Sequence, residues 1–147
     1  MSPAFVRKGY SRLEENLMAI FGIGAYYDED VSAEFIQANI VGVGWNVKDA
    51  PELHQFMCAL KVGDIVYIKA FSPSSPDIII KAIGIIMNAE IRTAANSNDL
   101  VACGRNVRWI HNQELRIPKP HEKNNVRANT IYEEFNPEVQ RMILQHI

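Results

Sequence analysis

The sequence predicts one α/β (α+β) domain built on a mixed, strongly curved β-sheet that forms a small barrel with helices on its outside. Three apolar runs of strand-forming residues, 40–45, 65–71 and 78–88, are the main observation. The last two are apolar nearly throughout rather than alternating, which indicates strands covered on both faces. The chain has 147 residues, of which 48% are hydrophobic, enough for one compact core and too few for two full domains. We therefore expect a single domain over 1–147, with its core in about residues 18–111.

The first half of the chain predicts strands and helices in alternation. Residues 18–27 predict a strand that Tyr26 and Tyr27 close, one facing inward and the other outward, because side chains alternate along a strand. Ser32 is suited to cap a short helix over 33–38 with its side chain.

A second helix is expected after the strand 40–45. Asp49 is a suitable N-cap, and Pro51 stands in the first turn, where its missing N–H does no harm. The apolar residues of this segment recur at helical spacing, which predicts a stripe packed inward: Leu53, Phe56, Met57 and Leu60.

The second half predicts a hairpin followed by a loop, a short strand and a terminal helix. The Ser- and Pro-rich loop 72–77 joins the two hairpin strands, and residues 89–99 are polar enough to predict a loop. Residues 107–110 predict a short strand in which Val107 and Trp109 share one face. Asn136, followed by proline, predicts the start of a helix over about 137–147.

Charge and cysteine content exclude several classes of protein. The net charge of −2 excludes a uniformly basic surface, although positive charge gathers between residues 105 and 127. Cys58 and Cys103 lack the spacing of a metal or redox motif, so we expect two reduced thiols that serve packing. No secretory leader and no apolar run near the ~20 residues that span a bilayer are present, so we expect a cytoplasmic protein with no membrane partner.

The sequence carries no catalytic signature. The four histidines are scattered and form no HExxH or other close ligand pair, so we expect no metal. The glycines lack the spacing of a phosphate-binding loop, and no nucleophile motif occurs. We therefore expect no catalysis and no cofactor, with action on a modified nucleotide as a minor alternative.

Two tryptophans are the leading candidates for a binding pocket. Trp45 ends one predicted strand and Trp109 lies in another, each next to polar or basic residues. Two indoles at a barrel mouth can sandwich a flat base, and stacking contributes about 1–3 kcal/mol per base; alternatively, both fill core volume. The other candidates for the pocket wall are Phe71, Tyr26, Tyr27 and Ser72.

Four basic residues are candidates for contacts with a nucleic-acid backbone. Arg105 and Arg108 flank Val107, and guanidinium groups suit bidentate phosphate contacts, although a solvated strand edge explains them equally well. Lys69 and Lys81 interrupt apolar runs, so they either extend to solvent from a sheet edge or line a groove that follows the backbone.

These pieces together resemble the EVE-like members of the PUA-like superfamily, in particular the modified-DNA-sensing modules attached to restriction endonucleases. The resemblance covers roughly residues 18–111 and rests on the order of six short pieces: Phe21 to Tyr27, Phe35 and Ile36, Gly42 to Trp45, Leu60 to Val66, Ala82 to Ile85, and Arg105 to Ile110. It implies a barrel with peripheral helices that accepts a flipped, modified base in an aromatic pocket while basic residues hold the backbone. The Gly-x-Lys-x-x-Glu-x-Arg signature of the ASCH relatives is missing, which disfavours an enzyme.

Two hypotheses follow from the sequence. The first is a non-catalytic module that binds DNA or RNA carrying a modified base, with any cutting left to a separate nuclease or effector protein. The second is a protein-interaction subunit of a defence or toxin-like system that binds no nucleic acid and uses its acidic N-terminal third.

Overall fold

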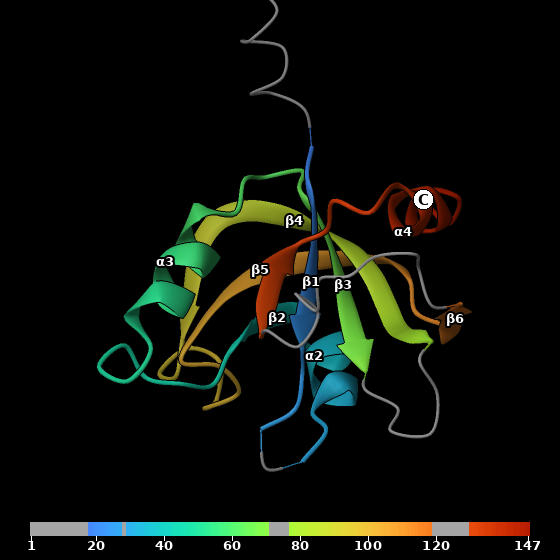
Figure 1. Cartoon of the computed structure of the whole chain (residues 1–147). Coiled ribbons are helices and arrows are strands. Elements are labelled where there is room, and N and C mark those ends of the chain that lie inside the picture. Colours follow the sequence, from blue (N-terminus) through green and yellow to red (C-terminus); the bar gives the residue numbers. More distant parts are fainter. Residues whose placement is uncertain (1–17, 28, 71–76, 119–129) are drawn as a thin grey trace, which may run out of the picture.

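The computed structural model describes residues 18–27, 29–70, 77–118 and 130–147. In sequence order its elements are β1 (Ile20–Gly24), α2 (Ser32–Ala38), β2 (Ile40–Val43), α3 (Pro51–Ala59), β3 (Ile65–Ala70), β4 (Ile78–Thr93), β5 (Cys103–His111), β6 (Leu115–Ile117), β7 (Ile131–Glu133) and α4 (Pro137–Leu144). Figure 1 shows the helices outside a bent sheet whose longest strands are β4 and β5. The predicted mixed α+β class is therefore confirmed.

The sheet has seven strands in the described residues, in the order β2-β5-β4-β3-β1-β7, with β6 paired to β4. β1 runs parallel to β3, whereas the other pairings are antiparallel. Bulges interrupt the β3–β4 and β4–β5 ladders, and bulges bend and twist a sheet. In the described part of the chain the end strands β2 and β7 do not pair, so closure into a barrel stays a prediction.

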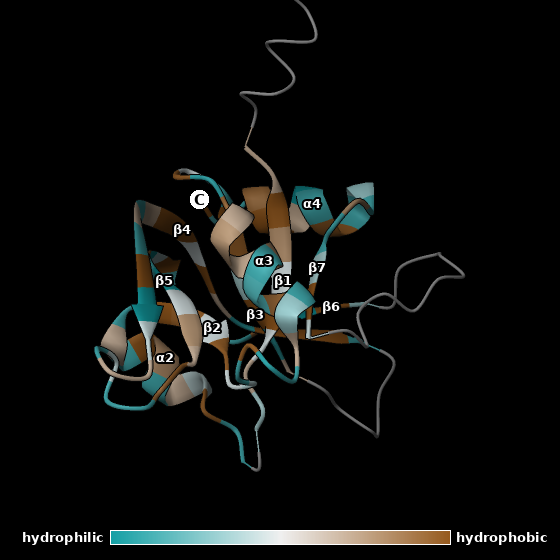
Figure 2. Cartoon of the chain, turned by 90° about the vertical axis from the view of Figure 1, so that its left-hand side faces the viewer, coloured by the Kyte–Doolittle hydropathy of each residue, from teal (hydrophilic) through white to brown (hydrophobic). Residues whose placement is uncertain are grey.

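Both faces of the sheet are covered, as the continuous apolar runs predicted. Val66 and Ile68 of β3 belong to a first core, together with residues of α2 and α3, whereas Ile65 and Tyr67 of the same strand belong to a second core under α4. Figure 2 shows long hydrophobic stretches in the strands and alternating hydrophobic and hydrophilic residues in α4. The sheet therefore lies between two apolar layers.

The predicted N-cap of α4 is confirmed, whereas the predicted N-caps of α2 and α3 are wrong. Asn136 caps α4, since its side chain accepts two backbone N–H groups of the helix at 2.9 and 3.2 Å. Ser32 does not cap α2 but donates its own N–H to the Asp30 carboxylate at 2.8 Å. Asp49 does not cap α3, because the N-cap position is Ala50 and no side chain caps the helix; the N–H of Asp49 bonds to the side chain of Asn46 at 3.2 Å. In both corrections an earlier Asx side chain forms a turn before the helix begins.

The predicted loop over 89–99 begins too early. β4 continues to Thr93, because Ile91, Arg92 and Thr93 pair with the start of β5. Side chains in this extension are mostly exposed, so its polar composition is compatible with a strand. β5 is longer than the predicted 107–110, because its first residues pair with this extension of β4. β7 was not predicted.

Candidate nucleic-acid interface

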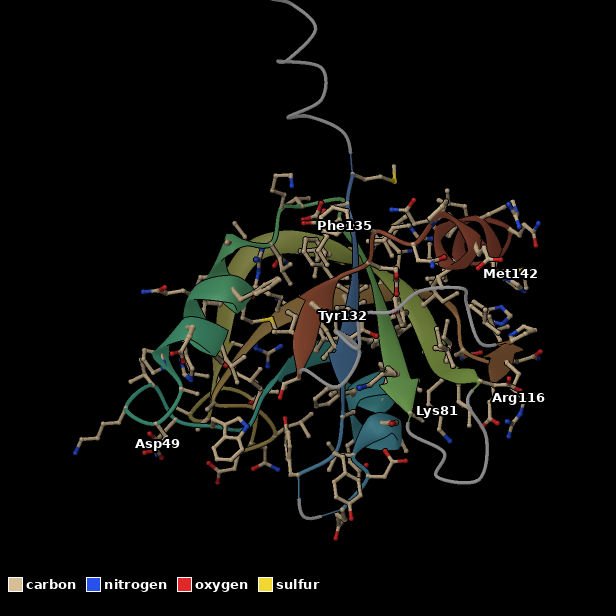
Figure 3. The ribbon with its side chains drawn as sticks, in the orientation of Figure 1. Asp49, Lys81, Arg116, Tyr132, Phe135 and Met142 are labelled. Carbon is tan, nitrogen blue, oxygen red and sulfur yellow. The ribbon has the colours of Figure 1, made fainter. Side chains whose placement is uncertain are left out.

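Trp45 lies in the loop between β2 and α3, and its side chain is 57% exposed. The backbone of this loop is held from two sides. The carbonyl oxygen of Trp45 lies 2.6 Å from Nε2 of His54 on α3, and the side chain of Asn46 accepts the backbone N–H groups of Lys48 and Asp49. These contacts hold the backbone of the loop, while most of the Trp45 indole stays outside the core. Asp49 of the same loop is labelled at the lower left of the molecule in Figure 3.

The ring of Tyr27 lies directly against this loop. A Cβ built on Gly44 would approach two atoms of the ring to 3.0 Å, so the absence of a side chain at Gly44 permits the contact. On another side the ring meets Phe35 of α2 edge-on, with centroids 6.2 Å apart. Gly44 immediately precedes Trp45, so the half-buried ring of Tyr27 packs on the backbone of the loop that carries the exposed indole.

The hydroxyl group of Tyr27 is buried and has no hydrogen-bond partner among the described residues. Burial raises the pKa of Tyr27 to about 12, so the group is a neutral phenol at physiological pH. A buried hydroxyl without a partner can accept or donate one hydrogen bond to a group that enters from outside. Tyr26 is 72% exposed, so the two tyrosines differ in exposure as predicted. The predicted strand over 18–27 is too long, however, because β1 ends at Gly24 and both tyrosines lie beyond it.

Trp109 has a different environment from Trp45. Its half-buried ring packs against the first core, opposite Gly84 of β4, where a Cβ would come within 2.8 Å of the indole. The indole Nε1 is buried and has no hydrogen-bond partner in the described part of the chain. Trp109 therefore fills core volume at least in part. Within that part of the chain, no ring contact joins the two indoles, and the predicted sandwich stays a prediction.

Arg105 corrects the sequence prediction, because it lies inside the protein and not at a nucleic-acid surface. Its side chain is 2% exposed. The guanidinium donates to the carbonyl oxygens of Met57 at 3.0 Å, of Leu60, and of Asn88 at 2.9 Å. These bonds satisfy carbonyls at the C-terminal end of α3 that the helix itself leaves unpaired. The charge thus anchors α3 to β4 and β5.

The other three basic candidates stay near the surface. Arg108 is exposed on the opposite face of β5 from Arg105. Lys81 pairs with Glu114 at 3.2 Å, and Lys69 lies 5.8 Å from the ring centroid of Tyr132. Figure 3 labels Lys81 on the right of the molecule and Asp49 of the Trp45 loop on the left. Their predicted role on a nucleic-acid backbone is untested.

Two of the predicted pocket residues, Phe71 and Ser72, lie outside the described residues. Conversely, sequence analysis missed Asn46 and His54, which shape the Trp45 loop. A signal for Asn46 was present, because an asparagine two or three residues before free backbone N–H groups favours an Asx turn. His54 carried no such signal, since its contact depends on the path of the loop back to α3.

The described residues contain no group of three His, Cys, Asp or Glu side chains that could hold a metal ion. None of the described helices combines the length and apolarity that crossing a membrane requires.

The fold is similar to that of a solved structure. No protein-family profile and no curated protein matches the sequence. The structure is similar to the YTH domain of the Zygosaccharomyces rouxii MRB1 protein, solved in complex with N6-methyladenosine RNA, with a TM-score of 0.56 and 11% sequence identity over 89% of this chain and 85% of that chain. The similarity shows a YTH-like fold, while the PUA-like and EVE-like assignments stay predictions.

Proposed function

We propose that this chain is a non-catalytic module that binds nucleic acid and accepts a flipped, modified base beside Trp45. The observation that carries the proposal is an indole with 57% exposure on a loop against which the Tyr27 ring packs at Gly44, in a fold similar to a YTH domain solved with N6-methyladenosine RNA. An indole held exposed on an ordered loop offers a flat face on which a base can stack.

The two aromatic residues would act in different ways on the base. The indole of Trp45 provides a stacking surface, which offsets the few kcal/mol that unstacking a base costs. The Tyr27 hydroxyl, a buried neutral group without a partner in the described residues, provides one hydrogen bond to a base edge. Stacking tolerates any base, so preference for a modified one has to come from such a polar contact and from the fit of the added group.

Basic side chains outside the core would hold the backbone. Arg108 is exposed, and Lys69 and Lys81 lie at the end of β3 and at the β3–β4 bulge. Contacts from a few such groups make binding salt-dependent without making it selective. The EVE-like proposal adds that the module serves a separate nuclease or effector protein.

The proposal is tested by tryptophan fluorescence with matched RNA and DNA oligonucleotides that contain adenosine or N6-methyladenosine, at two salt concentrations. The chain has two tryptophans, so Trp109→Phe leaves Trp45 as the reporter and Trp45→Phe leaves Trp109. We expect quenching of Trp45 by one modified oligonucleotide, with weaker binding at higher salt. Phe135→Ala is the matched control, because Phe135 is also an exposed aromatic residue. Binding that ignores both salt and the loss of Trp45 would contradict the proposal.

A protein-interaction subunit is the second candidate, and an apolar patch favours it. Four exposed apolar side chains project from segments that backbone hydrogen bonds bring together: Met18, Val62, Met87 and Phe135. Exposed apolar groups that gather in this way are typical of protein contacts. Retention of a protein partner that Phe135→Ala abolishes, with no oligonucleotide binding, would support this function instead.

A further inference from the structure

Two cysteines that are far apart in the sequence meet between α3 and β5. The Sγ atoms of Cys58 and Cys103 lie 4.0 Å apart although 45 positions separate the residues. Both are free thiols; Cys58 is exposed near the end of α3, and Cys103 is buried as the first residue of β5. The sequence predicted two reduced thiols that serve packing, and the fold makes them neighbours.

We propose that Cys58 and Cys103 form a reversible disulfide when the protein meets a peroxide, which links α3 to β5. This inference concerns a modification site outside the Trp45 loop and does not depend on nucleic-acid binding. A disulfide requires an S–S distance of about 2.05 Å, so the two sulfurs must approach by about 2 Å. The exposed side chain of Cys58 has room to make that movement, because solvent lies on one side of it.

The different burial of the two thiols sets the order of the steps. The thiolate of Cys58 attacks a peroxide oxygen; an S–O bond forms, the O–O bond breaks, and the departing oxygen leaves as water after taking a proton, so Cys58 becomes a sulfenic acid. The sulfur of Cys103 then attacks the Cys58 sulfur; the S–S bond forms, the S–O bond breaks, and the hydroxyl leaves as water with the Cys103 proton. In sum, two thiols lose two hydrogens and one peroxide becomes two waters.

Cys103 is the second sulfur to react because it is buried. Burial and, to a smaller extent, the neighbouring Cys58 raise the pKa of the Cys103 thiol to about 11, while the Arg105 guanidinium opposes the shift. Few Cys103 thiolates therefore exist at neutral pH, and the exposed Cys58 meets the oxidant first. The link also affects α3 as a whole, because α3 carries His54, which contacts the carbonyl oxygen of Trp45.

The experiment exposes the whole chain to a small excess of hydrogen peroxide and measures intact mass, followed by peptide mapping without reductant. We expect a loss of about 2 Da, a peptide pair joined through Cys58 and Cys103, and full reversal by dithiothreitol. Thermal unfolding of the oxidised protein should shift upward by roughly 5–10 °C, because the link closes a long loop in the unfolded chain.

Cys58→Ser is the principal control, because the residue is exposed and its replacement leaves the core intact. This variant should show neither the loss of mass nor the thermal shift. Cys103→Ala gives the complementary result, with Cys58 gaining oxygen instead of a partner. Wild-type protein that gains oxygen at Cys58 while Cys103 remains alkylatable after unfolding would overturn the proposal, as would disulfides found only between two chains.

Discussion

The loop that carries Trp45 and the strand that carries Trp109 use the same residue types in opposite ways. In the loop, hydrogen bonds hold the backbone and leave the indole exposed. In β5, alternation turns Arg105, Val107 and Trp109 towards the first core and leaves Arg108 outside. An aromatic or basic residue therefore marks a candidate contact only after its face of the strand is known. Substitutions at the inward-facing residues of β5 should therefore change mainly the stability of the protein, whereas substitutions in the Trp45 loop should change mainly its binding.

The largest effect is expected at the buried arginine. Arg105→Met should lower the free energy of unfolding by about 3–5 kcal/mol, because the carbonyls of Met57, Leu60 and Asn88 lose their buried donor. Urea denaturation followed by circular dichroism measures it. Arg108→Met is the matched control on the outer face, with an expected change within about 0.5 kcal/mol. Equal changes for the two arginines would refute the assignment of Arg105 to the core.

Substitution of the two tryptophans should likewise lower the stability more at the buried position than at the exposed one. Trp109→Ala should cost about 2–3 kcal/mol of unfolding free energy, since it removes a half-buried ring that packs against the first core. Trp45→Ala should change the stability by no more than about 0.5 kcal/mol, because the indole is mostly exposed. Denaturation followed by far-ultraviolet circular dichroism compares them without depending on tryptophan emission. A costly Trp45→Ala would mean that the loop supports the core.

The features that sequence analysis predicted are those governed by local pattern. Apolar runs identified the central strands, and the Asn-Pro pair identified the start of α4. The same reasoning would have placed Arg105 inside, because it lies two residues before Val107 and so shares its face. Its charge suggested a surface, yet three carbonyls at the end of α3 and on β4 supply the partners that a buried guanidinium requires.

Features that depend on tertiary contacts were beyond the sequence. The extension of β4 to Thr93 is held by pairing with β5 and not by its own composition. Likewise the packing of Tyr27 on Gly44 joins the segment after β1 to the end of β2, two strands that are not neighbours in the sheet. The site near Trp45 arises from this packing, so residue types alone indicated its members but not which of them meet.

Binding should show the reverse of the stability result. Trp45→Ala should weaken binding of the modified oligonucleotide by about 1–3 kcal/mol, or roughly 5- to 150-fold in Kd. A more conservative change, Gly44→Ala, should weaken binding less, because its Cβ presses on the Tyr27 ring from 3.0 Å and the ring has to shift. Gly24→Ala provides the control, since the nearest atom to its Cβ is 3.8 Å away. Fluorescence or anisotropy titration measures the affinity of all three variants. Equal affinities would show that the loop is not part of the binding site.

The smallest effect is expected from pH, acting on Tyr27. Its pKa in the folded protein is about 12, against 10.0 for an unperturbed tyrosine, because burial disfavours the phenolate. A group whose folded pKa is raised contributes stability that is complete below pH 10 and is lost as the pH rises towards 12, on the order of 1–2 kcal/mol.

Tyrosinate absorption during an alkaline titration, compared between wild type and Tyr27→Phe, isolates this group from Tyr67, whose pKa burial also raises. Tyr27→Phe removes a hydroxyl without a hydrogen-bond partner among the described residues, so it should leave stability at neutral pH nearly unchanged while flattening the alkaline loss. A Tyr27 that titrates near pH 10 would show that its hydroxyl is open to solvent, and the contrast between an enclosed phenol and an open indole would then fail.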